Sequence, residues 1–282
     1  MNDYILTLSC PDRIGIVHQV SHWLLGLNGN IIDAQQFGDL GTEQFFLRVH
    51  FALPQATPVE TLEQDFASIA QAFAMQARFH DANRKARVLI LVSRQGHCLN
   101  DLLFRTHSGH LPVDIAAVAS NHTDYRSMVE SYGIPFHYLP VAPDTRPQQE
   151  QQILDLVTQQ NIDLVVLARY MQILSDKLCK ALSGKAINIH HSFLPSFKGA
   201  RPYHQAHTRG VKIIGATAHY VTADLDEGPI IEQDIERVDH AMSPSALVQT
   251  GSDIESLVLS RAVRWHVEHR ILLNGQRTVV FR

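Results

Sequence analysis

The sequence predicts an α/β protein in which a small ferredoxin-like βαββαβ domain precedes a doubly wound, mostly parallel α/β domain. Two observations carry this prediction. Up to residue 80, period-two alternation and helical periodicity follow one another in the order strand, helix, strand, strand, helix, strand. After residue 85, continuous apolar runs of strand length alternate with helical stretches, which is typical of a parallel sheet covered on both faces. The length of 282 residues suits two domains.

The first elements follow from local patterns. Residues 4–9 alternate apolar and polar side chains, as a half-buried strand does. Apolar residues at helical spacing predict a helix over residues 14–27, which Asn28-Gly29-Asn30 is suited to end. Residues 31–37 and 43–53 alternate again, so a hairpin of two strands is expected.

A second helix and a fourth strand complete the small domain. Thr57-Pro58-Val59-Glu60 combines a capping box with Pro at the first helical position, so a helix is expected to begin there. Residues 76–80 alternate as a strand does, and the polar residues 81–85 resemble a linker. The predicted boundaries are a domain over 1–82, a linker over 83–86 and a second domain over 87–282.

The second domain is predicted to alternate strands and helices before its pattern changes. Buried strands are expected at 88–92, 115–119, 136–139, 164–168 and 186–189, with helices near 98–107, 124–132, 147–159 and 174–183 between them. Shorter strands at 213–221 and 229–236, a long helix over 244–266 and a hairpin through Asn274-Gly275 then follow.

The charge of the chain indicates which partners the protein binds, and its cysteines indicate the cellular compartment in which it works. The net charge is −4 and no block of Lys and Arg is present, so nucleic acid is not an expected partner. No run approaches the ~20 apolar residues that cross a bilayer, and the first residues lack the basic start of a signal peptide. Cys10, Cys98 and Cys179 are odd in number and widely spaced, as expected where thiols stay reduced. We therefore expect a soluble cytoplasmic protein with no membrane partner.

Polar residues are densest at the carboxyl end of the fifth strand of the second domain, from Asn188 to Ala200. Side chains two apart on a strand leave the same face, so Asn188 and His190 are expected to converge while His191 points to the other face. An amide donor and an imidazole would then share one site.

An acidic loop follows the next strand. His219 ends that strand, and residues 221–229 carry the carboxylates Asp224, Asp226 and Glu227. A carboxylate beside an imidazole is suited to acid–base catalysis. The residues alone leave an alternative open, in which Asn and His at the strand end satisfy backbone groups and the acidic loop is simply solvated.

A phosphate site is a weaker hypothesis. The first strand of the second domain leads through Ser93-Arg94-Gln95-Gly96-His97 into a helix, a position where backbone N–H groups often hold phosphate. A single glycine makes neither a dinucleotide fingerprint nor a Walker loop. A tight strand-to-helix turn is the competing interpretation.

A metal site is not expected. Five histidines are close in sequence: His190, His191, His204, His207 and His219. Adjacent strand residues do not readily share one metal ion, and the sequence contains neither H-E-x-x-H nor paired cysteines.

A family resemblance rests on these motifs. Asn188-x-His190, the turn Ser192-Phe193-Leu194-Pro195 and the Asp226 loop resemble the signature of folate-dependent formyltransferases. The longer strings over 188–203, 215–221 and 225–229 resemble the formyltetrahydrofolate deformylases more specifically, and Ser9-Cys10-Pro11-Asp12-Arg13-x-Gly15-Ile16-Val17 resembles an ACT domain. An ACT domain before a formyltransferase-like domain is the architecture of those deformylases.

The resemblance implies roles for individual residues. Asn188, His190 and Asp226 would be catalytic. Substrate would be bound by a group of residues around them: Met171, Gln172, Ile173, Leu174, Gly199, Val221 and Asp224. Gln172 departs from the Arg of a transformylase, and Gly96-His97-Cys98 departs from the Gly-Ser-Asn that grips the phosphate of its substrate.

With that acceptor site altered, the resemblance implies hydrolysis of 10-formyltetrahydrofolate to formate and tetrahydrofolate, with water as nucleophile and no cofactor. Such an enzyme would supply formate for purine biosynthesis and balance the one-carbon folate pool. Two alternatives stay open: a formyltransferase that uses an amine acceptor, and a catalytically inactive protein that senses amino acids.

The ACT resemblance implies a small amino-acid effector and a homo-oligomer formed through that domain. The effector site would include Asp12, Arg13, Gly15 and Asn30. Asp12 could meet an ammonium, and the start of the 14–27 helix a carboxylate. The competing interpretation is that Asp12 only caps this helix and Asn28-Gly29 only ends it.

Overall fold

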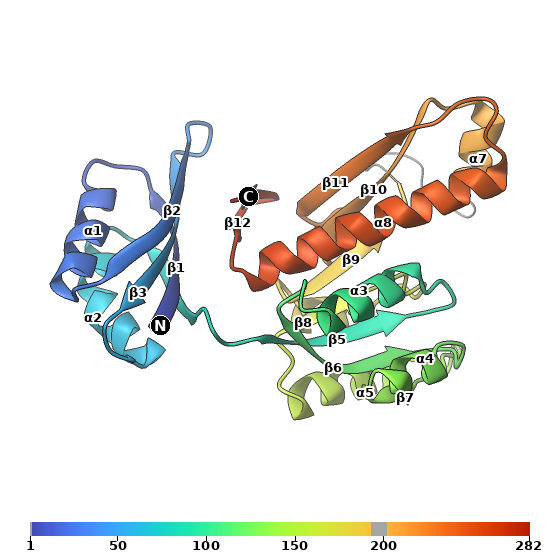
Figure 1. The fold of residues 1–282 in the computed structure, drawn as a ribbon, viewed down its shortest axis with the longest axis horizontal. Helices are drawn as coiled ribbons and strands as arrows, with labels where there is room; N and C mark the ends of the chain where they lie inside the picture. The colour runs from blue at the N-terminus through green and yellow to red at the C-terminus, as the bar shows by residue number, and fades with distance from the viewer. Residues whose placement is uncertain (1, 193–201) are drawn as a thin grey trace. The chain divides into compact units, whose positions relative to one another are not determined.

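The computed structural model describes residues 2–192 and 202–282, and these group into two compact units (Figure 1). One unit contains Met1–Lys85 and Glu268–Arg282, and the other contains Ala86–Val267. The second boundary differs from the predicted domain over 87–282, because the last residues of the chain pack with the N-terminal unit.

The N-terminal unit has the predicted βαββαβ order. Its elements within the first 85 residues are β1 (Asn2–Pro11), α1 (Ile16–Gly26), β2 (Asn30–Asp39), β3 (Gln44–Leu53), α2 (Val59–Ala72) and β4 (Gln76–Asp81). Among the described residues of this unit these strands form an antiparallel sheet in the order β2-β3-β1-β4. The core is aromatic: the Trp23 ring lies 5.0 Å from Phe66 and 5.4 Å from Phe79, between centroids.

The start of α2 differs from the expected capping box. Pro58 has φ −55° and ψ 140°, so it is the extended residue before the helix rather than the first helical one. No side chain caps this end, and the backbone N–H of Thr57 donates to the hydroxyl of Tyr4 instead. The segment before α2 is therefore held by this hydrogen bond to Tyr4 of β1, and the side-chain cap expected from Thr57 does not form.

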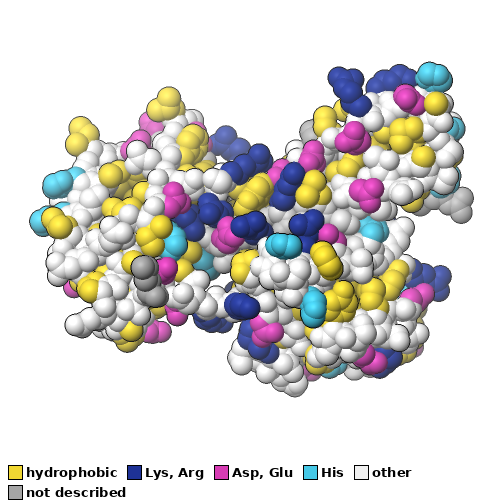
Figure 2. All heavy atoms as spheres, in the orientation of Figure 1, with side chains coloured by type: hydrophobic (Ala, Val, Ile, Leu, Met, Phe, Trp, Pro, Cys, Tyr) yellow, Lys and Arg dark blue, Asp and Glu magenta, His cyan; other side chains and the backbone are white. Residues whose placement is uncertain are grey.

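Large apolar side chains also lie on the surface of the N-terminal unit, among them Ile14, Leu25 and Leu40. Figure 2 shows apolar side chains at several places on the visible face of this unit. Exposed apolar residues are common singly on monomers, so their position alone does not define an interface.

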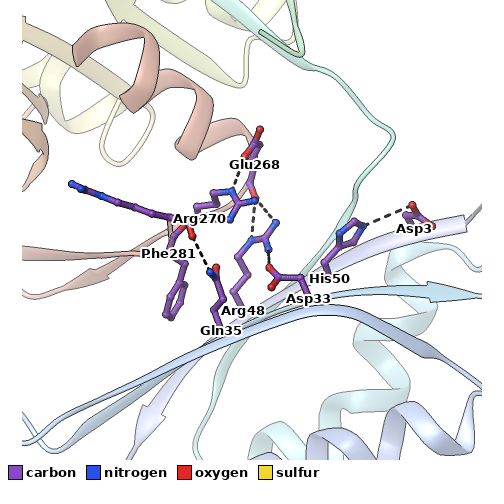
Figure 3. A network of polar contacts seen from close by, with 9 residues as sticks. Asp3, Asp33, Gln35, Arg48, His50, Glu268, Arg270 and Phe281 are labelled. Carbon is purple, nitrogen blue, oxygen red and sulfur yellow. Dashed lines mark hydrogen bonds and ion pairs between the residues drawn. The ribbon is translucent and has the colours of Figure 1, made fainter. Parts of the chain in front are cut away.

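The C-terminal residues form a hairpin of β12 (Ile271–Asn274) and β13 (Arg277–Val280). Figure 3 shows why they belong to the N-terminal unit. The Arg48 side chain on β3 is 3% exposed, and its Nη2 donates to the carbonyl of Glu268 at 3.0 Å. Its Nη1 lies 3.2 Å from Asp33. A buried guanidinium thus has its partners on both segments.

The second unit contains a mostly parallel sheet. Its strands are β5 (Ala86–Val92), β6 (Val113–Ser120), β7 (Phe136–Tyr138), β8 (Leu164–Leu167), β9 (Ala186–His190), β10 (Ile213–Tyr220) and β11 (Ile230–Arg237). Its helices, as far as the structure describes the chain, are α3 (His97–His107), α4 (Arg126–Ser131), α5 (Arg146–Gln159), α6 (Asp176–Ala181), α7 (Pro202–Arg209) and α8 (Pro244–Val267). The sequence prediction did not include α7.

The strand order β11-β10-β9-β8-β5-β6-β7 confirms the doubly wound prediction. β5 to β9 pair in parallel, whereas β10 pairs antiparallel with both β9 and β11. The chain runs from β5 outward to β7 and then returns to β8 on the other side of β5. Ligands of such sheets bind at the carboxyl ends of the strands near this reversal.

Helices fix the sheet from its faces. Leu89 and Leu91 of β5 share a buried cluster with Ile153 of α5 and Leu178 of α6. The long helix α8 packs along β9, β10 and β11 and against α3. Within the described residues, no helix has the length and apolarity needed to span a membrane.

Candidate active site

A cavity of about 240 Å³ opens at the carboxyl edge of the second unit's sheet. Three segments line it: residues 169–174 after β8, residues 188–191 at the end of β9, and residues 221–226 after β10. The first two segments lie at the carboxyl ends of the parallel neighbours β8 and β9. β10 runs antiparallel to β9, so the third segment leaves β10 beside Ala186 and Ile187 and returns along β9 to the cavity.

The structure brings Asn188, His190 and Asp226 together in this cavity. Nδ1 of His190 lies 3.2 Å from Oδ2 of Asp226. The other carboxylate oxygen, Oδ1, lies 3.6 Å from Nε2 of His219, and the Asn188 amide donates to that Nε2 at 3.2 Å. A carboxylate, two imidazoles and an amide therefore form one connected group.

Two backbone features hold Asp226 in place. Its φ is 58°, in the left-handed region that Asp tolerates better than most residues. Nearby, a Cβ at Gly228 would collide with the carbonyl oxygen of Tyr220, so the loop closes tightly only with glycine there. Burial alone would raise the pKa of Asp226, but the hydrogen bond from His190 outweighs it and holds the pKa below its usual value. The carboxylate is thus ionised at neutral pH.

His219 was not among the predicted catalytic residues, although the sequence places it at a strand end. Its Nδ1 donates to the carbonyl of Tyr220 at 2.9 Å, which leaves the lone pair on Nε2 in the neutral ring. That lone pair accepts one N–H of the Asn188 amide, so the second amide N–H remains for the cavity. His219 therefore orients Asn188, and the antiparallel pairing of Asn188 with His219 is the feature that places it there.

The prediction that His191 points away from His190 is wrong. Both residues line the same cavity, and their rings stack with centroids 4.9 Å apart. The physical reason is that β9 ends at His190, so strand alternation does not extend to the next residue. Burial, followed by the positive charge of Arg169, lowers the pKa of His191 to about 4. The His191 ring is therefore neutral at neutral pH.

Most of the predicted substrate-binding residues line the cavity. They are Met171, Gln172, Ile173, Leu174, Val221 and Asp224. Gly199 lies outside the described residues. The cavity also includes Arg169, which belongs to no quoted motif, and Leu225, which lies inside the quoted string 225–229 but was not assigned to the substrate.

The turn at Gly96-His97-Cys98 leads into a buried polar network rather than an open site. Nε2 of His97 lies 2.7 Å from Oε2 of Glu255 on α8, and Nε of Arg169 lies 3.4 Å from the same oxygen. The Tyr203 hydroxyl donates to Oε1 at 2.6 Å. Burial alone would raise the pKa of Glu255, but the His97 hydrogen bond and the Arg169 charge lower it overall.

Within the described residues, His97, Cys98 and Glu255 are the one group whose ligand atoms lie close enough to hold a metal ion. Their chemistry does not fit a cation. The Arg169 guanidinium already faces the Glu255 carboxylate. Burial raises the pKa of the Cys98 thiol, so it stays protonated and is a poor metal ligand. These donors fit an internal acid–base network instead.

The predicted effector residues lie at the start of α1 and β2. Gly15 precedes α1 with φ 99°, and no side chain caps this end, so the interpretation of Asp12 as the helix cap is wrong. The Arg13 guanidinium donates to the Ala72 carbonyl and covers the Phe73 ring at 4.2 Å. Asn30 begins β2.

The chain is similar to known proteins over most of its length. The family model described as formyl transferase matches residues 86–263. A formyltetrahydrofolate deformylase of Corynebacterium sp. (strain P-1) is 53% identical over 280 residues, covering 99% of this chain and 98% of that protein. This chain belongs to the formyltetrahydrofolate deformylase family.

Solved structures agree with this deformylase assignment. The structure of a formyltetrahydrofolate deformylase from Burkholderia mallei is similar with a TM-score of 0.95 and 48% identity, and each chain covers the other completely. A glycinamide ribonucleotide transformylase from Symbiobacterium toebii matches 70% of this chain and 95% of its own length, with a TM-score of 0.66 and 28% identity. The resemblance stated from the motifs is confirmed for the deformylase family and for the formyltransferase fold.

Proposed function

We propose that this chain hydrolyses 10-formyltetrahydrofolate to formate and tetrahydrofolate. The observation that carries the proposal is the contact of His190 with Asp226 beside Asn188, in a cavity of a deformylase-family fold. The three residues belong to one cavity and lie beside apolar side chains that suit a flat heterocycle.

The proposed chemistry begins at the formyl carbonyl. Water attack on its carbon forms a tetrahedral oxyanion, which needs hydrogen-bond donors. The free N–H of Asn188 and Nε2–H of protonated His190 supply them. Asp226, through Nδ1 of His190, orients this ring and stabilises its positive charge.

The step balances without another reactant. One C–O bond forms as the Asp226–His190 pair takes a proton from water, the bond from the formyl carbon to N10 breaks, and the pair returns that proton to N10 as it leaves. Formate departs as the anion, so one proton is released overall. The mechanism requires neither metal nor organic cofactor, because the folate is the substrate.

Residues of the cavity wall supply the folate contacts in this proposal. Met171, Ile173 and Leu174 offer apolar surface, while Gln172 and Asp224 offer polar groups for the edge of the pteridine. Transfer to an amine is disfavoured, because the His97–Glu255 contact already fills the strand-to-helix turn where an acceptor phosphate would bind.

We further propose a cytoplasmic enzyme that supplies formate for purine biosynthesis and balances the one-carbon folate pool. Assembly through the N-terminal unit as an ACT domain, with a small amino-acid effector near Asp12, Arg13, Gly15 and Asn30, belongs to the same proposal. The βαββαβ order and the uncapped start of α1 support it.

The deciding experiment incubates the purified chain with 10-formyltetrahydrofolate alone and assays formate. We expect release without an amine, and unchanged release after EDTA treatment. A strict requirement for an amine acceptor would contradict hydrolysis. Loss of activity with EDTA and recovery with zinc would contradict the mechanism without a metal.

A further inference from the structure

Three buried nitrogen atoms beside the catalytic group have no hydrogen-bond partner. Among the residues that the structure describes, these are Nη1 of Arg169, Nε2 of His190 and Nε2 of His191. All three residues line the same cavity. Buried N–H groups are normally paired, so unpaired ones gathered at one site indicate a ligand that carries acceptor atoms.

The fold places the residues that carry these nitrogens at the ends of two neighbouring strands. β8 and β9 pair in parallel with Leu167 opposite Asn188, and Arg169 and His191 each follow these positions by two or three residues. The rings of His190 and His191 stack, and Arg169 is close enough to lower the pKa of His191 by its charge. The guanidinium and both rings therefore face one region of the cavity.

Arg169 is fixed in an unusual conformation. Its φ is 62°, which is strained for an L residue with a long side chain. Its carbonyl accepts from the Ser93 backbone N–H at 3.2 Å, and the N–H of Met171, two residues on, donates to the Ser93 hydroxyl at 3.0 Å. Ser93, the residue directly after β5, thus holds the backbone at the position where Arg169 turns its side chain toward Gln95 and Glu255.

The guanidinium is bound on one side only. Nε and Nη2 both donate to Oε1 of Gln95, and Nε lies 3.4 Å from Glu255. Nη1 has no hydrogen-bond partner within the described part of the chain, and the Arg169 side chain is only 7% exposed, so solvent does not readily supply one. A guanidinium nitrogen is always a donor, so its missing partner must carry an oxygen or another acceptor.

We propose that Nη1 of Arg169 and Nε2 of His191 form a subsite for a small carboxylate, which in the catalysed reaction is the departing formate. The inference rests on the proposed hydrolysis for the identity of the anion. Formate is planar with two oxygens, and guanidinium groups bind such anions well. Neutral His191 serves as donor in its Nε2–H tautomer. The subsite would accept the product next to His190, where the C–N bond breaks.

The first test is direct binding. Calorimetric titration of the full chain with sodium formate, without folate and at constant ionic strength, is expected to show one site with a Kd on the order of 1 mM, the range that very small ligands reach. Acetate should bind more weakly because of its methyl group. Formate should also inhibit hydrolysis of the folate substrate at a similar concentration.

Two variants test the assignment to residues. His191→Phe keeps a ring against His190 but removes the donor, and Arg169→Lys keeps the charge but removes the planar fork. Each is expected to weaken formate binding at least ~10-fold. Arg105→Lys, at a half-buried ion pair with Asp101 on α3, is the matched control and should bind formate as the wild type does.

The outcomes separate this subsite from the proposed function. A wild-type chain that releases formate yet binds none at concentrations far above 1 mM overturns the subsite and leaves hydrolysis standing, with ordered water as the partner of the three nitrogens. Unchanged binding in both variants overturns it as well. A chain that binds formate but releases none from the folate keeps the carboxylate subsite and refutes the hydrolysis.

Discussion

Oδ2 of Asp226 lies 3.2 Å from Nδ1 of His190, and this contact joins the end of β9 to the loop after β10. The other oxygen of the same carboxylate faces His219 at 3.6 Å. One carboxylate therefore orients His190 and lies beside His219, and His219 in turn orients the Asn188 amide.

Asp226→Asn is expected to lower kcat by about 10²–10⁴-fold, because the amide cannot stabilise a protonated His190. Folate binding should change little, since the pteridine contacts are elsewhere in the cavity. Steady-state formate release and fluorescence titration of folate measure the two quantities. Asp101→Asn, at a half-buried ion pair on α3, serves as the control. Near wild-type turnover of Asp226→Asn would remove the carboxylate from the mechanism.

Asn188→Ala is expected to cost about 10²–10³-fold in kcat, the usual effect of losing one oxyanion donor. KM should stay close to that of the wild type, because the lost hydrogen bond forms in the transition state. Combined with Asp226→Asn, the loss should be far smaller than the product of the two single effects, since the residues act as one unit. Independent, multiplicative losses would show that they act separately.

Glu255→Gln is expected to lower the free energy of unfolding by about 3–5 kcal/mol, because it leaves Arg169 and His97 without their buried carboxylate. Glu130→Gln removes an exposed ion pair with Arg126 and should cost at most about 1 kcal/mol. Urea unfolding of both variants gives the comparison. Equal effects would mean that the network contributes no more than a surface pair.

His80 gives the N-terminal unit an acid-sensitive stability. Burial first, then Arg78 and Arg48, lower the pKa of His80 to about 4. The unfolded chain binds this proton near pH 6.5 and the folded one only near 4, so stability falls as the pH drops through this interval, by about 3 kcal/mol at most. His80→Gln should lose that part of the pH dependence. Urea unfolding at several pH values tests this, and identical pH dependence in both proteins would contradict it.

Truncation should follow the observed boundary and not the predicted one. Residues 86–267 expressed alone are expected to be more soluble than 87–282, because the longer piece exposes Leu272 and Phe281, which pack against Phe46 in the whole chain. Light scattering of the two pieces measures this. A monodisperse 87–282 and an aggregating 86–267 would show that the C-terminal hairpin belongs with the second unit.

Local patterns predicted most elements of this fold, because the period or apolar run that indicates each element lies within a few consecutive residues. The period-two stretch at 4–9 became part of β1, and the apolar run at 88–92 became part of β5. The short helix α7 escaped prediction, since its sequence, rich in His and other polar residues, carries a weak apolar stripe.

The sequence predicted site residues whose positions follow from strand geometry within a motif. It did not predict residues whose positions depend on tertiary structure. Asn188 and His190 are two apart on one strand, so their convergence followed from strand geometry. His191 lies beyond the strand end, and Arg169 owes its place to a left-handed backbone that no periodicity reveals. The position of the last fifteen residues beside β3 likewise depends on a contact between distant parts of the chain.

The hydrogen bond from Arg48 to the Glu268 carbonyl also determines when the N-terminal unit can complete its structure during synthesis. A ribosome makes β3 and then the whole second unit before it reaches Glu268, which takes roughly ten to forty seconds at ordinary elongation rates. Until then the Arg48 guanidinium has no carbonyl from that segment to receive its hydrogen bonds. The part of the chain that is made first therefore completes its structure after the part made in the middle, and a nascent chain stalled before Glu268 would present an unfinished sheet to chaperones.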